Sequence, residues 1–254
     1  MKMIIKIFLL IACIFVFIFS GYKIYTYVVE EKANKEINNS LVEKGVTIIN
    51  TTSNNENKNE IEDNNKDEEK LPINVNFSVL KRECKDIVGW IYMPDTPINY
   101  PVVQSEDNLY YVRRLIDGSY NNAGTIFMDF RNDSDLSNKN TIIYGHNMKN
   151  DKMFGTLEKY KKQEYYDTHK IMYYFAPEKN YKIELFAGCN ITVESSIYDL
   201  PTNISNYEKF KQKSDFKSDV ILTNEDKIIT LSTCSYNYDG ARYIVMGVLR
   251  EIVN

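Results

Sequence analysis

The sequence predicts a mainly β domain with helical decorations, arranged as a barrel or a sandwich. Short runs rich in β-branched and aromatic residues recur between residues 88 and 249, with turn-forming residues between them. The 254 residues are 43% hydrophobic and 26% charged, which is typical of a globular protein with one sizeable domain plus attachments. The net charge of -4 and the lack of a concentrated basic stripe in the body argue against nucleic-acid binding.

Residues 1–29 predict a signal anchor that spans a membrane. Lys2 and Lys6 flank the start of an apolar run over residues 7–19, and aromatic residues follow as far as Val29. This length approaches the roughly 20 residues that a membrane helix needs. A cleaved signal peptide is the alternative, but residues 19–23 contain no clear cleavage site. With the basic residues held in the cytoplasm, everything after the anchor is expected outside the cell.

Residues 30–70 predict a polar, flexible tether that begins with a short helix around residues 30–43. Asn, Lys, Glu, Asp and Ser dominate this segment, and large apolar residues are scarce after Ile49. Such a composition buries too little surface to offset the entropy of ordering. We therefore expect a spacer that lets the folded domain, residues 71–254, work at a distance from the bilayer.

The folded domain predicts mostly strands, starting after a helical segment at residues 76–86. Proline, glycine and polar clusters set the boundaries of the later elements. The expected strands are residues 88–92, 98–103, 124–129, 141–144, 171–175, 181–189, 228–233 and 243–249. The expected helices are residues 108–116, one or two within 153–166, and an amphipathic stretch at 207–216.

Cys234 and Arg242 are the first candidates for chemistry. Cys234 ends one predicted strand and Arg242 opens the next, so an antiparallel return places the two side chains near each other at the rim of a sheet. A thiol beside a fixed cation favours the thiolate. The structural alternatives are a small buried hydrophobe for the cysteine and a solvated charge for the arginine.

The chain has only two histidines, which narrows the search for a catalytic base. His146 follows a predicted strand and a glycine, so it has a rigid mount at a strand end. His169 lies in a polar connection and is expected to face solvent. The remaining cysteines, Cys13, Cys84 and Cys189, are widely spaced and form no C-x-x-C pair, so neither a zinc site nor a disulfide-dense scaffold is indicated. A disulfide between Cys84 and Cys189 stays open.

The run Thr230-Leu231-Ser232-Thr233-Cys234, with Arg242 after it and Tyr144-Gly145-His146 upstream, resembles the signature of the sortases. Sortases are cysteine transpeptidases of Gram-positive bacterial surfaces. The likeness to class B members extends over residues 87–91, 98–104, 126–132 and 153–169. The helical insertion between Cys189 and Lys227 also favours class B over the shorter class A body.

The resemblance implies an eight-stranded sortase-type β-barrel with an N-terminal helix and a helical insertion before the catalytic strand. Cys234 is expected to attack the Thr carbonyl of a C-terminal sorting signal on an exported protein, often an Asn-Pro-x-Thr motif in class B. An amine of a peptidoglycan precursor then resolves the thioester. His146 is expected to move protons and Arg242 to stabilise the oxyanion. No cofactor or metal is expected.

The resemblance also marks positions that line the peptide groove of class B enzymes: Asn108, Tyr144, Thr192, Ile197 and Ser232. Loop packing or capping explains each of them equally well. Ser235 departs from relatives that have an acidic residue after the cysteine, which leaves the local substrate contacts open. Two functional alternatives also remain: a thiol hydrolase of the same signal, and a non-catalytic wall-binding module.

Overall fold

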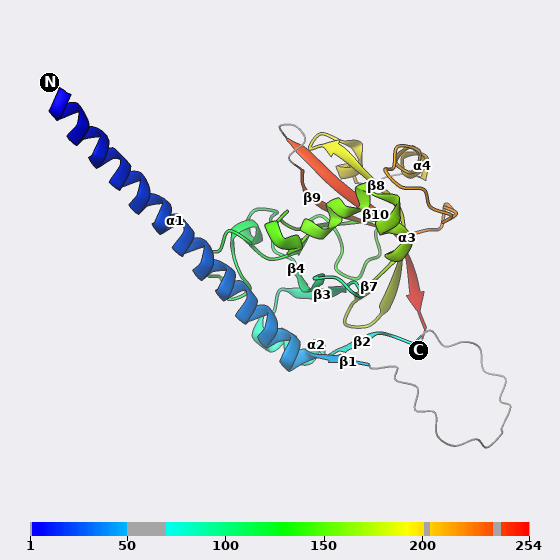
Figure 1. Cartoon of the computed structure of the whole chain (residues 1–254). Coiled ribbons are helices and arrows are strands. Elements are labelled where there is room, and N and C mark those ends of the chain that lie inside the picture. Colours follow the sequence, from blue (N-terminus) through cyan, green and yellow to red (C-terminus); the bar gives the residue numbers. More distant parts are fainter. Residues whose placement is uncertain (1, 50–69, 201–203, 236–239, 254) are drawn as a thin grey trace, which may run out of the picture.

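Eight strands close into a barrel in the order β10-β8-β7-β3-β4-β5-β6-β9 (Figure 1). The computed structural model describes residues 2–49, 70–200, 204–235 and 240–253. The barrel strands are β3 Ile87–Tyr92, β4 Asn99–Val103, β5 Phe127–Met128, β6 Asn140–Tyr144, β7 Ile171–Phe175, β8 Asn180–Thr192, β9 Ile228–Cys234 and β10 Ala241–Ile252. The mainly β prediction is confirmed, and the barrel is realised instead of a sandwich.

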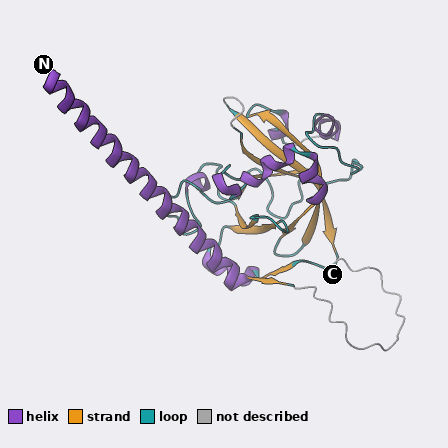
Figure 2. Cartoon of the chain, in the orientation of Figure 1, coloured by secondary structure: helices purple, strands orange, loops and turns teal. Residues whose placement is uncertain are grey.

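Helices surround the barrel without interrupting it (Figure 2). They are α1 Lys2–Gly45, α2 Phe77–Glu83, η1 Tyr110–Arg113, η2 Lys149–Asp151, η3 Gly155–Lys161, α3 Gln163–Thr168, η4 Ser196–Tyr198 and α4 Ile204–Gln212. The elements η4 and α4 lie between β8 and β9, so the helical insertion before the catalytic strand is present.

Two predicted helices are shorter than expected, and tertiary contacts explain both. The helix at residues 108–116 is a single 3₁₀ turn, η1, because Arg114 is extended and bridges to Tyr120. The helix at residues 207–216 ends at Gln212 because Phe216 enters the core, where its ring stacks on Tyr166 with the centroids 4.1 Å apart. Burial of an aromatic ring outweighs the weak helical preference of a single turn.

The barrel interior is a continuous apolar core. Alternate residues of the strands point inward, among them Ile143 of β6, Leu231 of β9 and Val245 of β10, and all three are fully buried. A second apolar cluster lies outside the barrel wall and includes Leu41 of α1 and Trp90 of β3. This outer cluster attaches α1 to the barrel.

Residues 30–49 differ from the predicted tether. The helix α1 is unbroken from Lys2 to Gly45, and its C-terminal part packs on the barrel, where Leu41 is only 2% exposed. The next residues form β1, Val46–Ile48, which pairs antiparallel with β2, Ile73–Val75. Composition averaged over the whole segment conceals the single helix face that is buried. Residues 50–69 of the predicted tether lie outside the described residues.

The N-terminal half of α1 stands clear of the body (Figure 1). The helix is long and apolar enough to cross a membrane, and its most apolar window has no residue buried against the rest of the protein. This arrangement is consistent with a single-pass membrane anchor.

Replacing Leu41 with Ala should destabilise the body by about 2 to 5 kcal/mol, because the substitution leaves a cavity between α1 and the barrel. Urea unfolding of the detergent-solubilised chain, followed by the fluorescence of Trp90, measures the change. Lys35→Ala on the exposed face of α1 is the control. Equal stability of the two variants would show that the contact between α1 and the barrel contributes little.

Candidate active site

The β9–β10 hairpin places Cys234 directly opposite Arg242. The two strands pair antiparallel, and the Cα atoms of these residues are register partners at the open end of the ladder. Both side chains are partly exposed, whereas the preceding residues of β9 are buried. The predicted strand, loop and strand are confirmed, although residues 236–239 of the loop lie outside the described residues.

His146 reaches the same rim through β6. This strand runs parallel to β9, with Tyr144 opposite Ser232, and the pairing continues through the hydrogen bond from Gly145 N to Ser232 O, 3.1 Å long. A Cβ at Gly145 would lie 2.7 Å from the ring of Phe154, so glycine permits the close packing that brings the chain around to His146. His146 and Cys234 each lie two residues beyond one register pair.

The imidazole of His146 is held by a backbone carbonyl. Its Nε2 lies 2.7 Å from the carbonyl oxygen of Val112, which is in η1. Because a carbonyl oxygen only accepts, Nε2 carries the hydrogen, and Nδ1 is then the basic nitrogen of the neutral ring. The neighbouring Asn147 donates from Nδ2 to the carbonyl oxygen of Cys234 at 2.9 Å, which ties the histidine loop to the cysteine strand.

A groove of about 320 Å³ contains the three candidate catalytic residues. It also contains three of the five positions expected to contact a peptide, namely Asn108, Tyr144 and Ser232. Its remaining lining residues, which the sequence prediction did not include, are Leu109, Val112, Phe127, Gly145 and Thr233. The barrel therefore brings together residues that lie more than a hundred positions apart in the chain.

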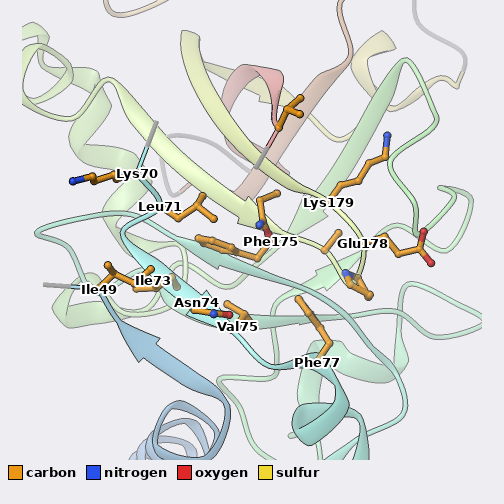
Figure 3. Close-up of a pocket in the computed structure, with 14 residues that line it drawn as sticks. Ile49, Lys70, Leu71, Ile73, Asn74, Val75, Phe77, Phe175, Glu178 and Lys179 are labelled. Atoms are coloured by element: carbon orange, nitrogen blue, oxygen red, sulfur yellow. The ribbon is translucent and has the colours of Figure 1, made fainter. Parts of the chain in front are cut away.

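A larger cavity of about 470 Å³ lies elsewhere (Figure 3). Its lining includes Leu71, Ile73 and Lys179, between β2 and the turn that joins β7 to β8. In the pairing of β8 with β10, Asn180 lies opposite Ile252, whereas Thr192 lies opposite Ala241 beside the groove. The two hollows are thus at opposite ends of this strand pair.

Thr192 and Ile197 lie outside the groove. Thr192 is the exposed last residue of β8, and Ile197 is fully buried, with its carbonyl oxygen accepting from Asn140 Nδ2 at 3.1 Å. The next residue, Tyr198, contacts the groove wall instead. Its ring stacks on Tyr144 at a centroid distance of 6.2 Å, and its hydroxyl is 2.7 Å from Ser232 Oγ. An aromatic residue beside Ile197 was the only sequence signal for this role.

Tyr198 is within electrostatic reach of the candidate nucleophile and the candidate cation. Burial raises the pKa of Tyr198 to about 12, the hydrogen bond with Ser232 and the charge of Arg242 oppose this rise, and Cys234 adds to it. The phenol is therefore neutral near pH 7 and available as a hydrogen-bond donor at the edge of the groove.

A buried carboxylate organises the opposite wall. Asp129 is fully buried and accepts from Tyr144 Oη at 2.9 Å and from Asn108 Nδ2 at 3.0 Å, and it pairs with Arg131 at 2.8 Å. Burial alone raises the pKa of Asp129, but the hydrogen bonds from Arg131 and Tyr144 outweigh it, so the pKa is lowered. Two groove residues are thus fixed by one ionised group that the sequence prediction missed.

Ser235, which follows the candidate nucleophile, points away from the groove. It is buried, and its Oγ donates to Glu158 of η3 at 2.9 Å. Burial raises the pKa of Glu158, but the hydrogen bonds from Lys161 and Ser235 lower it further, and the net shift is downward. The departure from an acidic residue at this position therefore affects the packing of β9 against η3 and leaves the groove lining unchanged.

The other candidate residues have structural surroundings. His169 Nδ1 lies 3.0 Å from the carbonyl oxygen of Tyr165, and the two rings stack. All four cysteines are described and free, so Cys84 and Cys189 form no disulfide. Burial raises the pKa of Cys189 to about 12, which leaves it a thiol. Among the described cysteines, Cys234 is the one that lines the groove.

Comparison with known proteins places this fold and groove in a family. A family model described as the sortase domain matches residues 91–250, which is more than half of the chain. The chain belongs to the sortase family. The sortase is 36% identical over 241 residues to sortase B of Listeria monocytogenes, and the match covers 92% of each chain. It is 36% identical over 183 residues to sortase B of Staphylococcus aureus, covering 69% of this chain and 75% of the relative.

Solved structures agree with the sequence relatives. A sortase B from B. anthracis has a TM-score of 0.71 and 33% identity, covering 87% of this chain and 98% of that one. A S. aureus sortase B–substrate complex has a TM-score of 0.64 and 36% identity, covering 70% and 85%. The predicted sortase transpeptidase of class B, with its eight-stranded barrel, is confirmed.

Asp129 also makes stability depend on pH. Because its pKa is lowered in the folded state, its contribution is present above the unfolded pKa, near 3.9, and is lost as the pH falls through the folded pKa. Asp129→Asn should cost about 1 to 3 kcal/mol near pH 7 and should flatten the loss of stability below about pH 4. Urea unfolding between pH 2.5 and 7, as an experimental range of roughly this width, measures both effects. Glu178→Gln, at an exposed site, is the control, and an unchanged acid limb in Asp129→Asn would contradict this assignment.

Proposed function

We propose that this sortase cleaves a C-terminal sorting signal after Thr and transfers the exported protein to an amine of a peptidoglycan precursor. The observation that carries the proposal is the groove, which holds Cys234, His146 and Arg242 at the ends of three barrel strands. A S. aureus sortase B has been solved as a substrate complex, and another sortase B as a complex with triglycine. These relatives support a peptide donor and an amine acceptor.

The first half-reaction uses Cys234 and His146. The thiolate sulfur forms a bond to the carbonyl carbon of Thr, and the C–N bond to the next residue breaks. His146, protonated on Nδ1, gives that proton to the leaving amine. The product is a thioester on Cys234 and a free C-terminal fragment of the signal. Val112 keeps the other ring nitrogen occupied, so the same Nδ1 serves throughout.

The second half-reaction reverses the proton flow. The precursor amine attacks the thioester carbonyl, His146 takes a proton from the attacking nitrogen, and Cys234 leaves as the thiolate. Arg242 stabilises the negative oxygen in both tetrahedral intermediates. One of its donors, Nη1, is fixed by the carbonyl oxygen of Ala241 at 3.0 Å, which restrains the guanidinium at the groove edge.

We further propose that the N-terminus is cytoplasmic and the barrel extracellular. Lys2 and Lys6 precede the apolar part of α1, which supports this orientation. Protease added to intact cells should then digest the body of the protein and leave a protected N-terminal fragment. Digestion only after the cells are permeabilised would reverse the assignment.

Substitution of the three groove residues should separate their roles. Cys234→Ala should abolish peptide cleavage and thioester formation, because no other group in the groove can form the acyl bond. His146→Ala should lower kcat by about 10² to 10⁴-fold, and Arg242→Lys by about 10² to 10³-fold. Cleavage is measured on peptides with a fixed Thr and varied flanking residues, starting from Asn-Pro-x-Thr, and the thioester by intact mass.

His169→Ala is the matched control, since this second histidine lies outside the groove, and its kcat should be unchanged. Product analysis with and without triglycine then distinguishes transfer from hydrolysis. A new amide product supports the transpeptidase, whereas the same acid product in both reactions supports the hydrolase. Full activity of Cys234→Ala would instead favour a non-catalytic wall-binding module.

A further inference from the structure

We propose that the C-terminal half of α1 is a positioning element of the active site, with Glu30 and Glu31 holding the two segments that fix His146. The inference rests on the proposed function for its kinetic test only. These two residues follow directly after the apolar segment of α1. The contacts that carry the proposal reach the imidazole from both sides.

The first path runs through the loop that follows η1. The Glu30 carboxylate accepts from the backbone N and the Nδ2 of Asn122, at 3.2 and 2.7 Å. The Glu30 carbonyl oxygen accepts from Asn121 Nδ2 at 2.7 Å. Asn121 is buried, and its backbone N donates to the carbonyl oxygen of Arg113 in η1 at 3.1 Å. The helix therefore fixes the loop that lies against η1.

The same loop supports the carbonyl group that binds His146. Gly124 has a φ of +58°, and a Cβ there would lie 2.4 Å from the carbonyl oxygen of Val112, so the two backbones are in close contact. Asn34 of α1 donates to the Gly124 carbonyl oxygen at 3.4 Å. The Val112 oxygen accepts from His146 Nε2 at 2.7 Å. A shift of this loop would thus move the acceptor that orients the ring.

The second path runs through the segment that follows His146. Glu31 forms an ion pair with Lys152. The carbonyl oxygen of Lys152 accepts from Gly155 N at 2.9 Å, and Phe154 N donates to the carbonyl oxygen of His146 at 3.0 Å. This closed loop holds the backbone of the histidine, while the first path holds its ring.

The arrangement places the coupling where the helix leaves the apolar segment. Short helical turns of the body lie beside the middle of α1, at the end of the body nearer the projecting half of the helix (Figure 2). The side chains of Glu31 and Lys152 are 32% and 36% exposed, so their ion pair is screened by water and its effect on the reaction is modest. The expected consequence is a change in the alignment of His146 without unfolding.

Glu31→Gln in the full chain, reconstituted in phospholipid nanodiscs, tests the proposal. Its kcat should fall by about twofold to fivefold with KM unchanged, because an exposed ion pair contributes a correspondingly small free energy. The limb of the pH profile that reports His146 should shift as well. The charge exchange Glu31→Lys with Lys152→Glu should restore part of kcat, which a merely structural defect would not allow.

Glu83→Gln is the matched control, since it breaks the other end of the contact between α1 and the body. Glu83 pairs with Lys44 at 2.8 Å, and this pair lies between α1 and α2, away from the groove. Glu83→Gln should leave kcat and the pH profile unchanged. Equal kinetics for Glu31→Gln and the wild type, or equal losses in both variants, would overturn the proposal.

Amide hydrogen exchange over residues 146–154 provides a readout that needs no substrate. Exchange in this segment should accelerate in Glu31→Gln and stay unchanged in Glu83→Gln. If the wild-type chain cleaves no peptide, the proposed function fails, while the exchange data still decide the coupling. Identical exchange in the wild type and Glu31→Gln would refute the positioning role even in an active enzyme.

Discussion

The parallel pairing of β6 with β9 is the constraint on which the active site depends. Its register sets Tyr144 opposite Ser232, and from that pair each chain continues for two residues to His146 and Cys234. A slip of one residue would turn the side chains of one strand to the other face of the sheet and remove the histidine from the groove. Closure of the barrel fixes this register, because β9 is also paired with β10 on its other edge.

Charged and polar groups behind the groove complement this backbone constraint. Asp129 orients Asn108 and Tyr144 on one wall, and Tyr198 links Tyr144 to Ser232 across the strand pair. These contacts restrain side chains that would otherwise sample several rotamers, so the wall that meets a substrate is organised in advance. The reactive groups are placed by the backbone, while the wall is shaped by a buried network.

Local patterns were sufficient for much of the fold and for the central candidates. The strands over residues 228–233 and 243–249 follow from alternation, and the placement of Cys234 and Arg242 follows from the hairpin. The positions of Tyr198, Asp129 and Leu41 depend on contacts between distant parts of the chain, which local periodicity does not encode. The tether prediction departs from the structure over residues 30–49 for the same reason, because a buried face of one helix is obscured in the mean composition.

The unbroken course of α1 gives the enzyme a fixed working height. The helix joins its apolar segment to the barrel without a flexible joint, since the same helix that begins at Lys2 carries Leu41 into the outer core. At 1.5 Å of rise per residue, the distance between the bilayer surface and the groove is set by residue count alone. Such an enzyme cannot search the thickness of the wall. Both of its substrates must arrive within one thin layer above the membrane, and the length of the helix selects that layer.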